Sequence, residues 1–171
     1  VSLSDDGNIV AMGAPGGNNQ TGNNAGRSYT RIYSWDGSSW IQLGNDIDGE
    51  ASGDWSGFSV SLSSDGNTVA IGAPANDGNG NGSGHVRIYN WNGGAWSQLG
   101  NDIDGIYYSS SGYSVSISGS GDKVAINNPG NYGPTRIYQY FSNTWNQVGS
   151  DINADPGTSA PVLSLSKDGN N

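Results

Sequence analysis

The sequence has no cysteine, one histidine, one glutamate and few charged residues. Without cysteine the chain can form no disulfide, thiolate nucleophile or cysteine-based zinc or iron–sulfur site, although the compartment stays open because many secreted domains need no disulfide. Six basic against fifteen acidic residues give a net charge of −9, which repels nucleic-acid phosphates and anionic membrane surfaces. No apolar run is long enough to span a bilayer. We therefore expect no nucleic-acid partner and no membrane insertion.

The chain is rich in glycine and in aromatic residues. The 171 residues include 29 glycines, 6 tryptophans, 9 tyrosines and 2 phenylalanines. So many aromatic side chains supply the apolar surface that a disordered chain lacks. The length fits one domain or a segment of a larger one.

An internal repeat organises the whole chain. The segment Val1–Pro15 recurs closely at Val60–Pro74 and more loosely at Val115–Pro129, and a further copy begins at Leu163. The chain therefore reads as a single segment of three full units and the first strand of a fourth. The units cover residues 1–59, 60–114 and 115–162, followed by 163–171.

Each unit carries four strand signals in the same order. In the second unit, alternating apolar and small residues predict strands at Val60–Ser63 and Val69–Gly72, and aromatic-rich runs predict strands at Arg87–Trp91 and Trp96–Leu99. Asp65-Gly66 predicts a two-residue type I′ turn between the first two strands. No stretch shows a sustained 3.6-residue apolar period, so we expect almost no helix.

Four antiparallel strands per unit, at repeats of about 40–60 residues, indicate the blades of a β-propeller. The first two strands carry small residues and the last two carry large aromatic ones, as blades that converge on an axis require. The predicted fold is all-β, with about three blades from a larger propeller. Three blades are fewer than the four or more of a closed ring, so we expect a longer parent chain or association between copies.

The Gly-Ala-Pro sequences ending at Pro15 and Pro74 resemble the FG-GAP repeat family, the blades of integrin-α-type propellers. The resemblance weakens in the third unit, where Asn127-Asn128-Pro129 replaces Gly-Ala-Pro. The family's Phe-Gly pair is reduced to its glycine at Gly57 and Gly112. The resemblance implies a propeller of about seven blades, extracellular or on the cell surface, that serves adhesion or ligand recognition.

Many members of the family bind calcium in the first hairpin of a blade through several acidic residues. Here that hairpin reads Ser64-Asp65-Gly66-Asn67, and a single carboxylate cannot supply six to eight oxygens. The family calcium site is therefore not carried over, and no cofactor is required. The Ser-Asp-Gly turn also resembles that of WD-type propellers, which are the second choice of family.

Acidic residues gather in the connection between the first two units. Asp48, Glu50 and Asp54 could collect Ca²⁺ there, since hard cations prefer carboxylate oxygens. The alternative is that these carboxylates are solvated or cap turns. The following connection lacks the later acids, but the first aspartate of the connection, Asp46, recurs in all three units, which favours this alternative.

One arginine and one aspartate recur in every unit. A guanidinium can pair with a carboxylate while it stacks on a neighbouring aromatic ring. We predict a structural contact between these residues, with ligand binding as the alternative. The residues are Arg31, Arg87 and Arg136, and Asp46, Asp102 and Asp151.

The long loops between the second and third strands contain two glycosylation acceptors, at Asn19 and Asn81, which would be occupied only in a eukaryotic source. The connections between blades contain Trp55, Tyr107 and Tyr108. These aromatic residues could be exposed and stack on sugar rings, or they could pack beneath a loop.

Catalysis finds little support, and no catalytic residue is assigned. His85 is the only histidine and Glu50 the only glutamate, so a catalytic triad or a histidine metal site would depend on His85 alone. The prediction is a non-enzymatic recognition or adhesion module whose partners are surface proteins or glycans. The alternatives are a lectin-like carbohydrate-binding propeller and a structural subunit of a fibre or sheath, which packs against other propeller segments or copies of itself.

Overall fold

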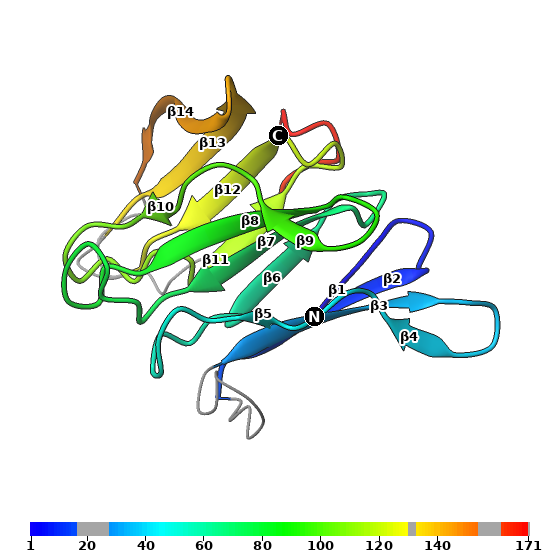
Figure 1. The fold of residues 1–171 in the computed structure, drawn as a ribbon. Helices are drawn as coiled ribbons and strands as arrows, with labels where there is room; N and C mark the ends of the chain where they lie inside the picture. Colours follow the sequence, from blue (N-terminus) through cyan, green and yellow to red (C-terminus); the bar gives the residue numbers. More distant parts are fainter. Residues whose placement is uncertain (17–27, 130–132, 154–161, 171) are drawn as a thin grey trace.

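A computed structural model of the chain describes residues 1–16, 28–129, 133–153 and 162–170. These residues contain no helix, and hence none long and apolar enough to cross a membrane. The strands form three antiparallel sheets that lie one behind the other along the chain (Figure 1). The all-β prediction is confirmed, and we call the three sheets blades 1, 2 and 3.

Blades 1 and 2 share one topology, in which the third strand pairs with two short strands on its outer side. Blade 1 consists of β1 (Ser2–Leu3), β2 (Ile9–Ala14), β3 (Tyr29–Trp35), β4 (Trp40–Gln42) and β5 (Ile47–Asp48). Blade 2 consists of β6 (Ser59–Leu62), β7 (Thr68–Ala73), β8 (His85–Trp91), β9 (Trp96–Gln98) and β10 (Ile103–Asp104). The predicted outer strands are therefore present, each divided into two pieces.

Blade 3 has four strands in the order β11-β12-β13-β14. Here the outer strand is continuous, with an irregularity between Thr135 and Ile137. The strands are β11 (Ser114–Ile117), β12 (Lys123–Asn127), β13 (Thr135–Phe141) and β14 (Thr144–Ile152).

The predicted type I′ turn is wrong. Residues 63–67 connect β6 to β7, and of these only Gly66 has a positive φ, at 72°, whereas a type I′ turn needs two such residues. The Asp65 carboxylate instead accepts hydrogen bonds from the Ser63 hydroxyl at 2.6 Å and the Asn67 backbone N–H at 3.0 Å. The Asp65 side chain thus closes a wider loop, and both of its carboxylate oxygens accept hydrogen bonds within that loop.

Two hydrophobic cores lie between the blades. In each core, aliphatic residues from the rear face of one blade meet aliphatic and aromatic residues from the front face of the next. Between blades 1 and 2 the core comprises Ala11, Ile32, Ile47, Leu62, Val69 and Ile71, with Leu43, Tyr89 and Trp96 packed against it. Between blades 2 and 3 the equivalents are Ala70, Ile88, Ile103, Ile117, Val124 and Ile126, with Leu99, Tyr138 and Trp145.

Glycines let the blades approach closely. A Cβ on Gly72 would lie 2.0 Å from the carbonyl oxygen of Gly112 in the next blade, and one on Gly13 would lie 1.9 Å from that of Gly57. No side chain fits such a gap. The Gly-Ala-Pro glycine of one blade therefore packs on the glycine that begins the next.

Each blade is also tied to the one before it by a tryptophan. The indole N–H of Trp96 donates to the carbonyl of Leu43 at 2.8 Å, and that of Trp145 donates to the carbonyl of Leu99 at 2.8 Å. Buried indole groups need such a partner. The contact between neighbouring blades is thus repeated in its polar as well as its apolar part.

Residues 162–170 lie where the first strand of a further blade would lie. The backbone N–H of Leu165 donates to the Ser116 hydroxyl at 2.9 Å, as that of Ile117 donates to the Ser61 hydroxyl at 3.1 Å. In the part of the chain that the structure describes, no strand pairs with this segment. The first strand predicted for a fourth unit is therefore docked on blade 3, but it belongs to none of the three described sheets.

Candidate functional site

The connections between blades gather at one end of the molecule, which we call the connection end. In blade 2, Ser59 at the start of β6 pairs with Gly72 near the end of β7, and His85 at the start of β8 pairs with Asp104 at the end of β10. Three loops therefore lie together at this end, on the left in Figure 1. They are residues 49–58, 74–84 and 105–113.

Two tyrosines lie on this end in a loop held by many hydrogen bonds. The backbone N–H of Tyr108 donates to Asn81 and that of Ser110 donates to Gly82, both at 3.0 Å. Tyr107 and Tyr108 contact each other edge to face at 4.2 Å, and they lie over Gly80 and Gly82. Tyr107 is 58% and Tyr108 46% exposed, so of the two alternatives left open by the sequence, the structure has them facing solvent.

A second aromatic cluster lies over the connection between blades 1 and 2. Trp55 stacks on Phe58 at 6.0 Å, and Phe58 contacts Tyr113 of the next connection at 4.8 Å. All three rings are more than a third exposed. Sequence reasoning found Trp55 but missed Phe58 and Tyr113. Each directly follows the glycine that begins a blade, and this shared position was the available signal.

The backbone at these aromatic residues is constrained. Trp55 and Tyr108 have φ values of 58° and 57°, in the left-handed region that bulky residues rarely occupy. Such conformations persist where the surrounding structure imposes them, and they concentrate at functional sites. The backbone that carries Trp55 and Tyr108 is therefore held in place, and their rings also contact neighbouring rings.

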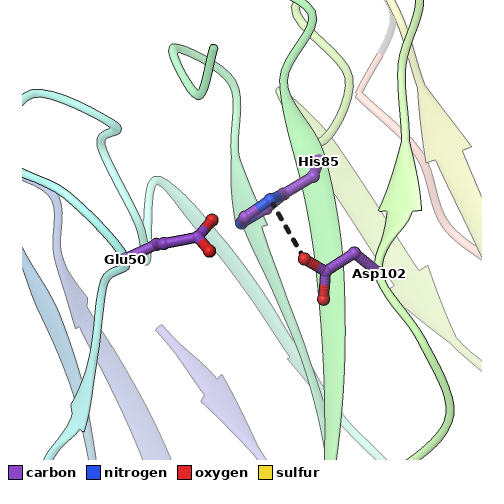
Figure 2. A group of neighbouring side chains, drawn as sticks. All are labelled: Glu50, His85 and Asp102. Carbon is purple, nitrogen blue, oxygen red and sulfur yellow. Dashed lines mark ion pairs between the residues drawn. The ribbon is translucent and has the colours of Figure 1, made fainter. Parts of the chain in front are cut away.

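A group of polar side chains at the connection end is shown in Figure 2. Glu50 comes from the first connection, His85 from the start of β8, and Asp102 precedes β10. Their potential ligand atoms lie within 4.8 Å of one another. His85 is buried, and its Nδ1 lies 3.8 Å from Asp102 Oδ2.

Arg87 holds this polar group together. Its Nη2 lies 2.7 Å from Asp102 and 3.1 Å from Glu50. A metal ion held by these carboxylates would have to share them with the guanidinium, so the positive charge that the site needs is already supplied by Arg87. The geometry therefore fits a structural ion-pair network that joins the connection to blade 2.

The three carboxylates predicted to collect Ca²⁺ do not form a metal-ligand group in the described residues. Glu50 pairs with Arg87, and Asp54 is buried and accepts from Asn76 Nδ2 at 2.8 Å. Asp48 is half-buried on β5. Asp54 also accepts the backbone N–H of Ala51 at 3.1 Å, so this carboxylate caps a turn, as the alternative expected, whereas Glu50 is held in an ion pair.

The predicted contact between arginine and aspartate is present in all three blades. In each, the Nε and Nη2 atoms of the arginine reach the two carboxylate oxygens at 2.7–2.9 Å, and a glutamine also donates to that carboxylate. These bonds lower the pKa of Asp151 to about 2 and also lower the pKa of Asp46. The pairs are Arg31–Asp46, Arg87–Asp102 and Arg136–Asp151.

Burial of His85 makes stability depend on pH. Desolvation and the nearby Arg87 lower the pKa of this imidazole below its ordinary 6.5. The unfolded chain then binds more protons than the folded chain as the pH falls below about 6.5, so stability decreases there. Asp46 and Asp102, whose pKa values are lowered, lose their contribution only below their ordinary pKa of 3.8. Burial raises the pKa of Asp104, so this carboxyl has the opposite effect and partly offsets the fall caused by His85.

We expect the free energy of unfolding in urea to fall between pH 7.5 and pH 5. The variant His85→Asn, which has no imidazole to protonate, should lose most of this fall. An equal fall in the variant would show that another group causes it.

The two predicted glycosylation acceptors differ in what the structure describes. Asn19 lies outside the described residues. Asn81 is exposed at the connection end, and its carbonyl accepts the N–H of Tyr108. A glycan on Asn81 would stand beside the tyrosine pair.

A comparison to known families matches the segment that runs from the end of blade 1 into blade 2. Residues 47–89, which run from β5 to Tyr89 of β8, match the family model described as FG-GAP repeat. This segment is an FG-GAP repeat. The resemblance predicted from the Gly-Ala-Pro sequence at Pro74 is confirmed there. A search of curated proteins finds no match to the chain.

Solved structures show the same fold at low sequence identity. A proposed 6-phosphogluconolactonase from Bacteroides fragilis aligns with a TM-score of 0.61 at 14% identity, over 90% of this chain and 38% of its own. TolB from Acinetobacter baumannii aligns with a TM-score of 0.51 at 15% identity, over 98% and 35%. A proposed 6-phosphogluconolactonase from Bacteroides uniformis gives 0.53 at 16%, over 88% and 42%. The chain spans less than half the length of these proteins, and the likeness concerns the fold alone.

Proposed function

We propose that this chain is a non-catalytic recognition segment of an extracellular β-propeller, and that its connection end binds neutral carbohydrate. The observation that carries the proposal is the fixed display of exposed aromatic rings on that end. They are Trp55, Phe58, Tyr107, Tyr108 and Tyr113.

Aromatic rings in a rigid backbone suit sugar binding. A sugar ring presents a face of C–H groups that packs on an aromatic face, while its hydroxyls bond to nearby polar groups. Residues 105–113 are tied to the loop 76–84 by backbone hydrogen bonds. The backbone of these two loops therefore loses little conformational entropy when a ligand binds. The neighbouring Asn79 and Asp77 offer further polar groups at this end.

The net negative charge of the chain disfavours anionic glycans as ligands. A net charge of −9 repels uronate and sulfate groups, so the ligand should be a neutral polysaccharide. The proposal includes an extracellular or cell-surface location, as the resemblance to integrin-α-type propellers implies.

The test is a calorimetric titration with laminarin, xyloglucan and galactomannan, with alginate as the anionic probe, because calorimetry does not depend on Trp55 as a reporter. We expect at least one neutral polysaccharide to bind and alginate not to bind. Trp55→Ala and the pair Tyr107→Ala/Tyr108→Ala should each weaken binding at least about tenfold, the loss of one good aromatic contact. Phe141→Ala, which removes a 73% exposed ring from the opposite end of blade 3, is the control. Binding that survives both connection-end variants would refute the proposal.

A structural role is the second candidate, as a subunit of a fibre or sheath. The observation in its favour is that the first and last blades each leave an apolar face uncovered by any described sheet.

A further inference from the structure

Three asparagines of the chain directly precede a glycine, at Asn79, Asn81 and Asn92. An asparagine in this position can lose its side-chain amide, because the backbone nitrogen of the next residue can attack the side-chain Cγ. Glycine has no Cβ to hinder this attack. The nitrogen reacts only when its N–H proton leaves, so the three sites differ in what holds the N–H of the following glycine.

At the first two sites this N–H is held. The Gly80 N–H donates to the Asp77 carbonyl at 3.0 Å, and the Gly82 N–H donates to the Asp77 carboxylate Oδ1 at 2.7 Å. Each bond must break before the nitrogen can attack. The negative charge of the carboxylate also opposes loss of a proton from the Gly82 nitrogen, because that loss leaves an anion beside it.

At the third site the nitrogen is not held. Asn92 and Gly93 lie in the exposed turn between β8 and β9, away from the connection end. Among the residues that the structure describes, the N–H of Gly93 donates to no group. A Cβ on Gly93 would meet no atom within 4 Å, so water and hydroxide can reach this backbone.

The side chain of Asn92 is held in a form that favours the attack. Its Oδ1 accepts the backbone N–H groups of Gly94 at 3.0 Å and Ala95 at 2.8 Å. When the Gly93 nitrogen adds to Cγ, negative charge develops on Oδ1. The two N–H groups directed at this oxygen stabilise that charge, as the donors of an oxyanion hole do.

We propose that Asn92 is a site of spontaneous deamidation, and that it reacts faster than the other two asparagines that precede glycine. The Gly93 nitrogen loses its proton to solvent and forms a bond to Cγ. The bond from Cγ to Nδ2 then breaks, and this nitrogen takes a proton and leaves as ammonia. Water opens the resulting cyclic imide at either of its two carbonyl carbons, which gives aspartate or isoaspartate and one additional negative charge.

Blade 1 shows that the turn accepts the aspartate product. Asp36 holds the place of Asn92 in the turn between β3 and β4. Its Oδ1 accepts the backbone N–H groups of the residues two and three positions further on, both at 2.8 Å. Aspartate can therefore form at position 92 without loss of the turn, whereas isoaspartate adds a methylene to the backbone.

The first test measures deamidation site by site in the full chain. Trypsin places Asn92 in the peptide 88–123 and the other two sites in the peptide 32–87. After incubation at pH 8, mass spectrometry should show conversion at Asn92 at least about fivefold faster than at either other site, the factor that one ordinary hydrogen bond represents. In urea, where the bonds are lost, the three rates should become similar. Equal rates in the folded chain would overturn the proposal.

A pair of variants tests the assignment within the peptide 88–123. Asn92→Gln should remove the fast conversion, because the longer side chain must close a larger ring. Asn101→Gln, in the same peptide but before an aspartate, should leave the fast conversion unchanged. Fast conversion that persists in Asn92→Gln would refute the assignment.

A further variant tests the protection by the held N–H. Asp77→Ala removes the carboxylate that binds the Gly82 N–H and keeps the carbonyl that binds the Gly80 N–H. Conversion at Asn81 should therefore accelerate several-fold, while the rate at Asn92 stays the same. An unchanged rate at Asn81 would show that this hydrogen bond does not control the reaction.

Discussion

Gly72→Ala should strongly destabilise the protein. The new Cβ would lie 2.0 Å from the carbonyl oxygen of Gly112 and 2.5 Å from the Ser59 hydroxyl oxygen, and the first of these is backbone that cannot rotate away. Blades 2 and 3 must separate to admit it. We expect a loss of at least about 3 kcal/mol in the free energy of unfolding, or roughly 6–12 °C in Tm.

Gly94→Ala is the matched control for this prediction. Gly94 lies in the turn between β8 and β9, where a Cβ would have one neighbour, 3.8 Å away, and its φ is not positive. Its effect should stay within about 0.5 kcal/mol. Urea unfolding of the two variants measures the difference, and similar values for both would mean that the blades are not in close contact at Gly72.

Ile88→Ala should cost about 3 kcal/mol, since it empties a fully buried position in the core between blades 2 and 3. Ile137 occupies the same place in blade 3, on the face that no described sheet covers. Ile137→Ala should therefore cost less than about 1 kcal/mol, measured at a concentration where the chain sediments as a monomer. Equal losses would contradict the assignment of the cores to the spaces between blades.

The repeat made most of the fold predictable. A repeated pattern of alternating and aromatic-rich strands fixes four strands per unit, and the recurrence of Arg87 and Asp102 in every unit pointed to their contact. These features depend on local sequence and on equivalence between units, which one sequence contains. The glycine contact between Gly72 and Gly112 was not predicted, because it depends on the distance between blades.

The errors have local physical causes. Asp65-Gly66 is a strong signal for a two-residue turn. In the structure the Ser63 hydroxyl and the Asn67 N–H donate hydrogen bonds to the Asp65 carboxylate, and these bonds stabilise a wider loop. Acidic residues close in sequence suggested a calcium site, yet Arg87 reaches across from β8 to bind Glu50. Spacing along the chain does not reveal a partner supplied by another strand.

The most direct test of recognition at the connection end uses the six tryptophan indole N–H signals in an ¹H–¹⁵N correlation spectrum. Laminarin, xyloglucan or galactomannan, whichever binds in the titration, would be added stepwise. The account predicts that the Trp55 signal shifts, while those of Trp35 and Trp91, at the opposite ends of β3 and β8, stay in place. A shift at Trp35 or Trp91 with none at Trp55 would contradict it.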